Sequence, residues 1–478
     1  NETSLDNYKE ARKRLELSGA EPVALALLDE KLGRVLATMN RYDEALEVLE
    51  RPAEVYREAR DLESVARVTA LIGWTHRYCG TPQEGIARIQ PVLELVTWTG
   101  PSQGLASLHL ALAYLHFGSG KYQESLEAAE RAGELARAVG DGLTLAGAEM
   151  RRGTALTMVG RADEGTRVLE ASIPLLESAG DLSTLAIALN NLASNYQSEG
   201  DLERALERGR QAMSTHERVG NTASIGFVEL GLGEINLYLG DWEEAEVAIE
   251  HGAATLQSVG ASWYAPFAPL HRGHLKLRQG RWDEARNYLN EAIALAEPIG
   301  ELQILEIGSW LMAELEIREG RAEDARSRME PLAEKGSLYQ CLHLTNLAWA
   351  QLMMGDPNRA AETANQALAI ADEKHQRLWM PDALRVQGMI LARQELWGEA
   401  DSAFEEAISM ARSGSYPYPE ARALYEQGLM HKQRGATRQA EDCLSGALAI
   451  FQRLGALKDV EWTERELTVL DRPAEPAR

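Results

Sequence analysis

Residues 192–205 read LASNYQSEGDLERA, and this stretch holds the features that recur along the whole chain. Gly200 ends a polar segment and is followed at once by the acidic Asp201. Small residues flank the glycine at fixed distances, with Ala193 seven residues before it and Ala205 five residues after it. Glycine reaches left-handed backbone angles without a Cβ penalty, and carboxylates are favoured in the first turn of a helix. The stretch therefore predicts one helix, a tight turn and the start of a second helix.

The turn glycine recurs with a period of 40 residues. Asn40 holds the same phase one unit before the first marker, and a step of 35 residues separates Gly320 from Gly355. The 40-residue step then continues through Glu395 to Gly435, which gives eleven units. Repetition at such a period is typical of solenoid proteins, in which each unit packs on its neighbours. The regularly spaced markers are Gly80, Gly120, Gly160, Gly200, Gly240, Gly280 and Gly320.

Small residues accompany every marker. The positions seven before and five after it hold only Gly, Ala or Ser, which lets the backbones of two helices approach closely. A further glycine near the half period, as at Gly140 or Gly220, ends the second helix of a unit. Each unit is therefore helix, turn, helix, turn. We predict an all-α fold, an α-solenoid superhelix of about eleven 40-residue helix hairpins.

Domain organisation follows from the same repeat. We expect a lone or capping helix within residues 1–20, with a helix over 2–17, and a continuous superhelix over 21–470. The proline-containing tail at 471–478 is expected to be disordered. The chain begins with Asn1 and a half unit, which suits either a cap or a segment of a longer protein.

Net charge and cysteine usage exclude several classes of function. The chain carries 49 basic and 73 acidic residues, a net charge of −24, which disfavours binding to nucleic acid or to an anionic membrane. The three cysteines are far apart and form no C-x-x-C pair, which favours a reducing cytoplasm. The sequence shows neither a signal peptide nor an apolar run long enough to cross a bilayer.

Motifs of known catalytic chemistry are missing from the sequence. No phosphate loop, H-E-x-x-H or C-x-x-C occurs. Ser102 lies in a G-x-S-x-G match, but a turn between two helices lacks the strand that a nucleophile elbow needs. His271 and His274 have a spacing compatible with metal ligands, yet no carboxylate or cysteine nearby in sequence completes a site. We therefore predict no catalytic residue, no metal and no cofactor; a cryptic enzyme is the weakest hypothesis.

The repeat resembles the tetratricopeptide repeat. Residues 192–205 carry the resemblance, as do Leu232 and Gly233 followed by Gly240-Asp241-Trp242 and Ala245. The unit here is longer than the usual length of about 34 residues, which implies longer helices. The apolar residue expected before the small one is polar at several units, for example at Arg152 and Gln387.

The long array and its acidic turns resemble one family in particular, the sensor region of bacterial MalT-like regulators, which are STAND-type signal-transduction ATPases. The resemblance implies that the superhelix captures an inducer (a small molecule, a peptide or a protein) and so relieves autoinhibition. It also implies an ATPase core and an effector domain in the same full-length chain. The alternative is a free-standing scaffold that mediates protein–protein assembly.

The resemblance also implies where a ligand binds. In tetratricopeptide arrays the first helices line the concave face, so residues ten, six and three before each marker are expected there. Aromatic side chains with a few charges suit sugars, nucleobases or peptide side chains, although such aromatics also pack between adjacent helices. The candidates are a first aromatic cluster of Trp74, Arg77, Tyr114 and Phe117, a polar stripe of Asn190, Ser194 and Gln197, and a second aromatic cluster of Trp310, Glu314, Trp349, Arg385 and Tyr425.

Overall fold

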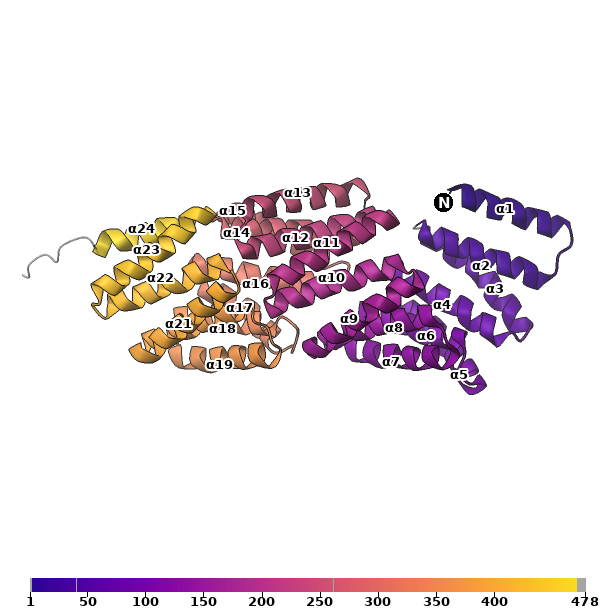
Figure 1. Cartoon of the computed structure of the whole chain (residues 1–478), viewed down its shortest axis with the longest axis horizontal. Helices are drawn as coiled ribbons and strands as arrows, with labels where there is room; N and C mark the ends of the chain where they lie inside the picture. The colour runs from indigo at the N-terminus through magenta and orange to yellow at the C-terminus, as the bar shows by residue number, and fades with distance from the viewer. Residues whose placement is uncertain (1, 40, 261, 471–478) are drawn as a thin grey trace, which may run out of the picture. The chain divides into compact units, whose positions relative to one another are not determined.

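A computed structural model describes residues 2–39, 41–260 and 262–470. Within these ranges the regular structure is helical, and eleven antiparallel helix pairs follow one another from α2/α3 to α22/α23 (Figure 1). A single helix, α1, precedes the pairs and another, α24, follows them. The predicted all-α solenoid of about eleven hairpins is therefore confirmed. The tail at 471–478 and the marker Asn40 lie outside the described residues.

The helices divide into two compact units, residues 1–188 and residues 189–478, hereafter unit 1 and unit 2. The boundary falls inside α10, Leu182–Glu199. The helices of unit 1 are α1 Glu2–Leu17, α2 Pro22–Thr38, α3 Tyr42–Glu58, α4 Leu62–Tyr78, α5 Pro82–Val96, the 3₁₀ turn η1 Thr97–Thr99, α6 Gln103–Gly118, α7 Tyr122–Val139, α8 Gly142–Met158 and α9 Ala162–Ala179.

Unit 2 continues the same alternation of first and second helices. Its helices are α11 Leu202–Val219, α12 Thr222–Leu239, α13 Trp242–Ser258, the 3₁₀ turn η2 Ser262–Tyr264, α14 Phe267–Arg278, α15 Trp282–Ala296, α16 Leu302–Arg318, α17 Ala322–Ala333, α18 Gln340–Met353, α19 Pro357–Glu373, α20 Met380–Arg393, α21 Trp397–Ser413, α22 Pro417–Gln433, α23 Thr437–Leu454 and α24 Leu457–Leu470. None of the described helices is both long enough and apolar enough to cross a bilayer.

The turns adopt the left-handed backbone that the glycine markers predict. The described glycine markers from Gly80 to Gly435 have positive φ, between 71° and 87°. Glu395 takes the same conformation with a φ of 62°, and so do the half-period residues Arg60 and Ser415. Because non-glycine residues rarely adopt this conformation, the close packing of consecutive helices imposes the turn even where no glycine provides it.

The small residues lie where the two helices of a pair approach most closely. A Cβ added at Gly388 on α20 would come within 2.7 Å of the Phe404 ring on α21. At Gly153 on α8, an added Cβ would meet Leu169 on α9 at 2.7 Å. Large side chains of the second helix thus fill the space above each glycine, which explains why these positions admit only small residues.

The five-residue deletion after Gly320 is taken up by shorter helices. Helix α17 has 12 residues and α18 has 14, whereas most helices have 16 to 18. Gly336 supplies the left-handed turn between them, with a φ of 64°. Buried side chains from α16, α17 and α18, among them Ala313, Met329 and Ala348, share one core, so the packing of consecutive helices continues through the deletion.

Candidate functional site

In unit 1 the first aromatic cluster assembles on one face of α4 and α6. The ring centroids of Trp74 and Tyr114 lie 4.2 Å apart at an angle of 49°. The guanidinium carbon of Arg77 lies 4.8 Å from the centre of the Tyr114 ring and 5.9 Å from that of Trp74. Tyr114 is buried, whereas Trp74, Arg77 and Phe117 are half-buried. The four residues expected here are therefore brought together, and Trp74, Arg77 and Phe117 each keep part of their surface exposed.

A fifth member of this cluster, Arg151 on α8, was missed by the sequence reasoning. Its guanidinium carbon lies 3.9 Å from the Tyr114 ring centre and 4.4 Å from that of Phe117. The side chain is only 3% exposed, and its Nε has no hydrogen-bond partner. Burial lowers the pKa of Arg151 to about 10, and the like charge of Arg77 acts in the same direction. Arg151 nevertheless remains charged at neutral pH.

A signal for Arg151 did exist in the sequence. It lies three residues before Thr154, which has the groove phase of its unit, and residues three apart share one face of a helix. Projecting only the positions ten, six and three before each marker left it out. A charged residue on that face, between the small or apolar Ala148 and Ala155, was the available indication.

In unit 2 the second aromatic cluster surrounds a buried carboxylate. Glu314 on α16 is 2% exposed. Its Oε1 accepts hydrogen bonds from Arg278 Nη1 on α14 at 2.5 Å and from Arg422 Nη1 on α22 at 3.0 Å, and Arg318 Nη1 lies 3.8 Å away. Burial alone would raise the pKa of Glu314, but these guanidinium groups outweigh burial and lower it well below its usual range.

The remaining members of this cluster lie around the same charges. Arg385 is buried with its guanidinium carbon 4.7 Å from the Trp349 ring centre, and its Nε donates to Asp382 at 3.0 Å. Trp310 is also buried, and half-buried Tyr425 packs against the core that contains Trp310. The cluster therefore forms, but most of its side chains face other residues of the chain and not solvent.

Four carboxylates and four arginines make up what we call the unit 2 charge network. Each arginine lies within 4.0 Å of a carboxylate of the set, which holds equal numbers of acidic and basic side chains. The sequence reasoning found only two of the eight members, since the others do not have the projected phases. The network consists of Glu314, Asp382, Glu426, Asp459, Arg278, Arg318, Arg385 and Arg422.

Contacts between distant repeats explain why this network is buried. The Tyr416 hydroxyl donates to the Gly200 carbonyl at 2.5 Å, across 216 residues of sequence. The Leu457 amide donates to the Gln279 carbonyl at 3.3 Å, and Arg318 pairs with Asp459. We call these the closure contacts. They show that the starts of α22 and α24 pack against the turns after α10 and α14, and that both helices contact α16; the proximity of α22 and α16 can be followed in Figure 1.

The polar stripe lies on one face of α10, within unit 2. Asn190 and Gln197 are half-buried and Ser194 is exposed, with the Ser194 hydroxyl donating to the Asn190 carbonyl at 3.3 Å. The three residues line a cavity of about 20 Å³ together with residues of α11 and α12. A space of this size holds one water molecule and no larger ligand.

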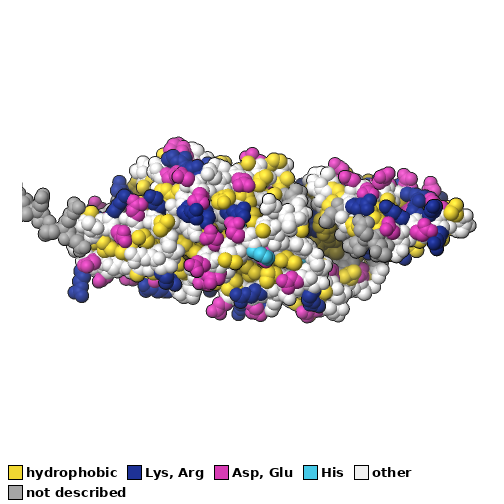
Figure 2. Space-filling model, turned by 90° about the horizontal axis from the view of Figure 1, so that it is seen from above, with side chains coloured by type: hydrophobic (Ala, Val, Ile, Leu, Met, Phe, Trp, Pro, Cys, Tyr) yellow, Lys and Arg dark blue, Asp and Glu magenta, His cyan; other side chains and the backbone are white. Residues whose placement is uncertain are grey.

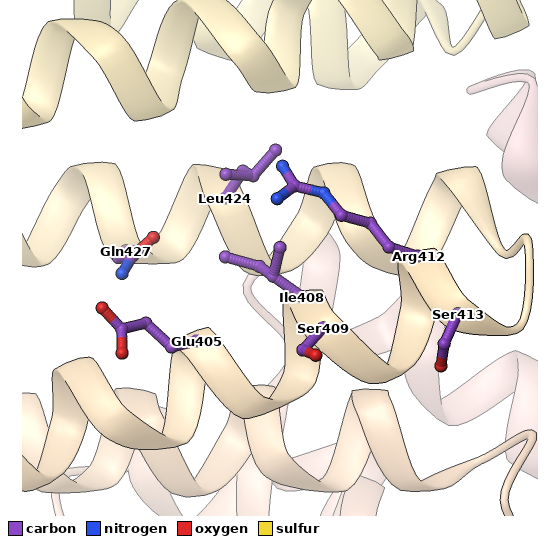
Figure 3. A pocket seen from close by; sticks show the side chains of 7 residues that line it. All are labelled: Glu405, Ile408, Ser409, Arg412, Ser413, Leu424 and Gln427. Carbon is purple, nitrogen blue, oxygen red and sulfur yellow. The ribbon is translucent and has the colours of Figure 1, made fainter.

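A wider cavity of about 660 Å³ lies along α21 and α22 (Figure 3). Figure 3 shows Ile408 and Leu424 side by side, with Arg412 reaching over the same opening. Arg412 Nε donates to Glu420 at 2.6 Å, and Gln427 Nε2 donates to Asp401 at 2.8 Å. Arg412 and Gln427 thus have partners within the protein, and the lining contains none of the sequence candidates.

The residues weighed for chemistry have structural roles. Ser102 caps α6, because its Oγ accepts a hydrogen bond from the Leu105 amide at 3.1 Å. His271 and His274 are buried beside Glu234, a carboxylate distant in sequence, at 3.8 and 3.7 Å. Among the described residues no group of three His, Cys, Asp or Glu side chains has the arrangement of a metal site. On the face drawn in Figure 2, acidic and basic side chains are interspersed.

Comparisons with known proteins agree with this architecture. A family model of the tetratricopeptide repeat matches residues 184–258. A family model of anaphase-promoting complex subunit 5 matches residues 98–152, 230–317, 324–391 and 383–415. No curated protein matches the chain.

Solved structures similar to the chain are helical repeat proteins. The apo form of RapI is 10% identical, with a TM-score of 0.50 over 73% of this chain and 98% of that one. Human IFIT1, in a dimer with PPP-AAAA, is 14% identical with a TM-score of 0.46, over 85% of this chain and 91% of IFIT1. A STAND protein with a tetratricopeptide repeat sensor from Pyrococcus horikoshii is 13% identical with a TM-score of 0.43, over 70% of this chain and 55% of that one. The eleven helix pairs, the glycine turns and the family match over residues 184–258 support one conclusion: the described helices form an array of tetratricopeptide type.

Proposed function

We propose that this array is a non-catalytic sensor module that captures a ligand at the unit 1 cluster of Trp74, Arg77, Tyr114, Phe117 and Arg151. The observation that carries the proposal is the contrast between the two aromatic clusters. In unit 2 every arginine of the charge network has a carboxylate partner. In the unit 1 cluster, by contrast, no described carboxylate forms an ion pair with Arg77 or Arg151. Partly exposed aromatic surface beside a charge that has no carboxylate partner is typical of a binding site.

We further propose that the module belongs to a bacterial, cytoplasmic STAND-type regulator. In that setting the ligand binds one conformation of the array more tightly than another and so shifts the population away from the autoinhibited form. The 40-residue period and the acidic turns support this proposal. The full coding sequence tests it, because a STAND regulator requires a nucleotide-binding domain with a phosphate loop in the same polypeptide. A coding frame without such a domain would contradict it.

The binding site itself is tested with a matched pair of tryptophan variants. Trp74→Ala removes an aromatic plate of the cluster, while Trp98→Ala removes a tryptophan that is 89% exposed on η1, outside the cluster. Thermal shift assays against pools of metabolites and short peptides should find a pool that stabilises the wild type and Trp98→Ala. The same pool should leave Trp74→Ala unshifted. Equal stabilisation of both variants would mean that the ligand binds elsewhere.

A second candidate function is a scaffold that binds protein partners. The exposed Trp98 favours it, together with the half-exposed Leu95 beside it on α5, since exposed large apolar side chains mark protein contact surfaces. The same two variants separate the functions. If the protein is a scaffold that uses this surface, the Trp98→Ala variant should no longer bind a purified protein partner, whereas Trp74→Ala should still bind it. This is the reverse of the result expected for the sensor.

A further inference from the structure

Two arginines of unit 1 carry charges that the protein does not neutralise. Arg77 and Arg151 come from α4 and α8 and approach the same ring, that of Tyr114 on α6. Their guanidinium carbons are therefore no farther apart than the sum of 4.8 and 3.9 Å. Within the described residues no carboxylate forms an ion pair with either of them, although the chain has 73 acidic residues. In so acidic a protein, two adjacent unpaired arginines require an explanation.

Burial gives the charge of Arg151 a desolvation cost. Arg151 is only 3% exposed, and its Nε has no hydrogen-bond partner. Its guanidinium interacts with the aromatic faces of Tyr114 and Phe117 and with the Tyr114 hydroxyl. Such cation–π contacts offset only part of the desolvation of a buried charge. The site therefore retains an excess of positive charge.

The neighbouring residue Arg152 shows what the protein does with an arginine that has no such role. Its Nη2 donates to Glu149 at 2.7 Å, and Glu149 also accepts from Arg137 at 2.7 Å. The carboxylate of Glu149 thus pairs with Arg152 and Arg137. Arg151, on the same helix, lies against the aromatic cluster and has no carboxylate partner.

We propose that Arg77 and Arg151 form a recognition site for an oxyanion, a carboxylate or phosphate group carried by a small ligand whose flat or apolar part lies on Trp74. The proposal rests on the proposed sensor function and names the chemistry of its ligand. Guanidinium groups match the two-oxygen edge of carboxylates and phosphates. Arg77 is half-buried and would contact the anion directly, while Arg151 is buried against the Tyr114 ring and adds its positive charge to the site.

The net charge of −24 limits the size of the ligand. The acidic chain disfavours long polyanions such as nucleic acids, because their many phosphates need many cationic contacts and this site offers two arginines. A ligand with one oxyanion gains the two arginines without that repulsion. Trp74, tilted by 49° against Tyr114, offers the remaining surface for an aromatic or aliphatic group.

The test uses isothermal titration calorimetry with three probes that share a phenyl group: benzoate, phenyl phosphate and benzyl alcohol. We expect the wild type to bind at least one of the two anions and to bind the neutral alcohol roughly tenfold more weakly or not at all, because charged hydrogen bonds are lost. The better of the two anions identifies the headgroup as carboxylate or phosphate. Equal binding of the neutral probe, or no binding of either anion, would overturn the proposal.

Variants connect this binding to the two arginines. Arg77→Met and Arg151→Met should each weaken the preferred anion roughly tenfold or more, whereas Arg152→Gln, on the same helix but paired with Glu149, should leave its affinity unchanged. Circular dichroism melts check that each variant folds; if Arg151→Met does not fold, the half-exposed Arg77→Met alone decides. Anion binding that survives in Arg77→Met refutes the site. A neutral ligand that binds the wild type but not Trp74→Ala would refute the oxyanion and leave the sensor function standing.

Discussion

Replacing Glu314 with Gln tests whether the unit 2 charge network stabilises that unit. The substitution keeps the size of the side chain and removes the charge that Arg278 and Arg422 share, at 2.5 and 3.0 Å. Arg422 keeps Asp382 at 3.3 Å, but Arg278 is 5% exposed and loses the carboxylate to which it is bound. Removing one partner of a buried pair typically costs about 3–5 kcal/mol, because it leaves a buried charge without compensation.

The stability change should be measured by urea unfolding and localised by hydrogen exchange. Whole repeat arrays often unfold in more than one step, so a single midpoint is not sufficient. We expect the amides of α14, α16 and α22 to lose protection together in Glu314→Gln, since these helices supply the network residues. The helices of unit 1 should keep their protection. Loss of protection spread evenly over both units would contradict a local role.

Two comparisons make the result interpretable. Glu284→Gln removes a carboxylate of an exposed pair, with Arg281 at 2.6 Å, and should cost no more than about 1 kcal/mol. The double variant Glu314→Gln, Arg278→Met removes the stranded charge and should recover part of the loss, as expected for directly coupled residues. If Glu314→Gln destabilises unit 2 no more than the exposed control does, the network is not the stabilising element that its geometry indicates.

Three further predictions concern the closure contacts, the small-residue positions and pH. Tyr416→Phe removes the hydrogen bond to the Gly200 carbonyl and should lower the free energy of unfolding by about 1 kcal/mol, with faster amide exchange at that turn; unchanged exchange would speak against it. Gly388→Ala places a methyl group 2.7 Å from the Phe404 ring and should cost about 1–3 kcal/mol in urea unfolding, whereas a neutral effect would show that the ring moves freely. Because the folded pKa of Glu314 lies well below the unfolded value of about 4.3, its contribution to stability is present above that pH and is lost as pH falls below it. The urea midpoint should therefore drop on acidification below about pH 4, and less steeply in Glu314→Gln.

The fold could be predicted because it is encoded locally. The turn at Gly200 and the small residue at Ala205 recur in each unit, so the same short-range rules predict every hairpin. The deletion after Gly320 was also visible in the sequence, as a step of 35 residues in place of 40. The sequence did not show that the deletion would shorten α17 to 12 residues. Non-glycine turns such as Arg60 and Ser415 show that the period, more than the residue, determines the backbone.

The candidate site was only partly predictable, because its chemistry depends on contacts between repeats. Phase within a repeat indicated that Trp74 and Tyr114 share a face, since they occupy equivalent positions in consecutive repeats, and their rings are in contact. Nothing in that phase shows that Tyr416 reaches Gly200 or that Arg422 reaches Glu314, 108 residues away. Such pairings depend on how several consecutive repeats stack on one another, which the pattern of a single repeat does not reveal.

The closure contacts within unit 2 make the two aromatic clusters unequal as ligand sites. A ligand could reach Trp349 only by displacing Arg385 and Arg422, which lie 4.7 and 5.2 Å from its ring centre and have carboxylate partners. If this exposure costs as much as breaking one buried pair, about 3–5 kcal/mol, the apparent affinity falls roughly a hundredfold to several thousandfold below the intrinsic one. Trp74 needs no such opening, because it is half-exposed and its neighbour Arg77 has no acid to release. Under the proposed function, a ligand of moderate intrinsic affinity is therefore expected at the unit 1 cluster and not at Trp349.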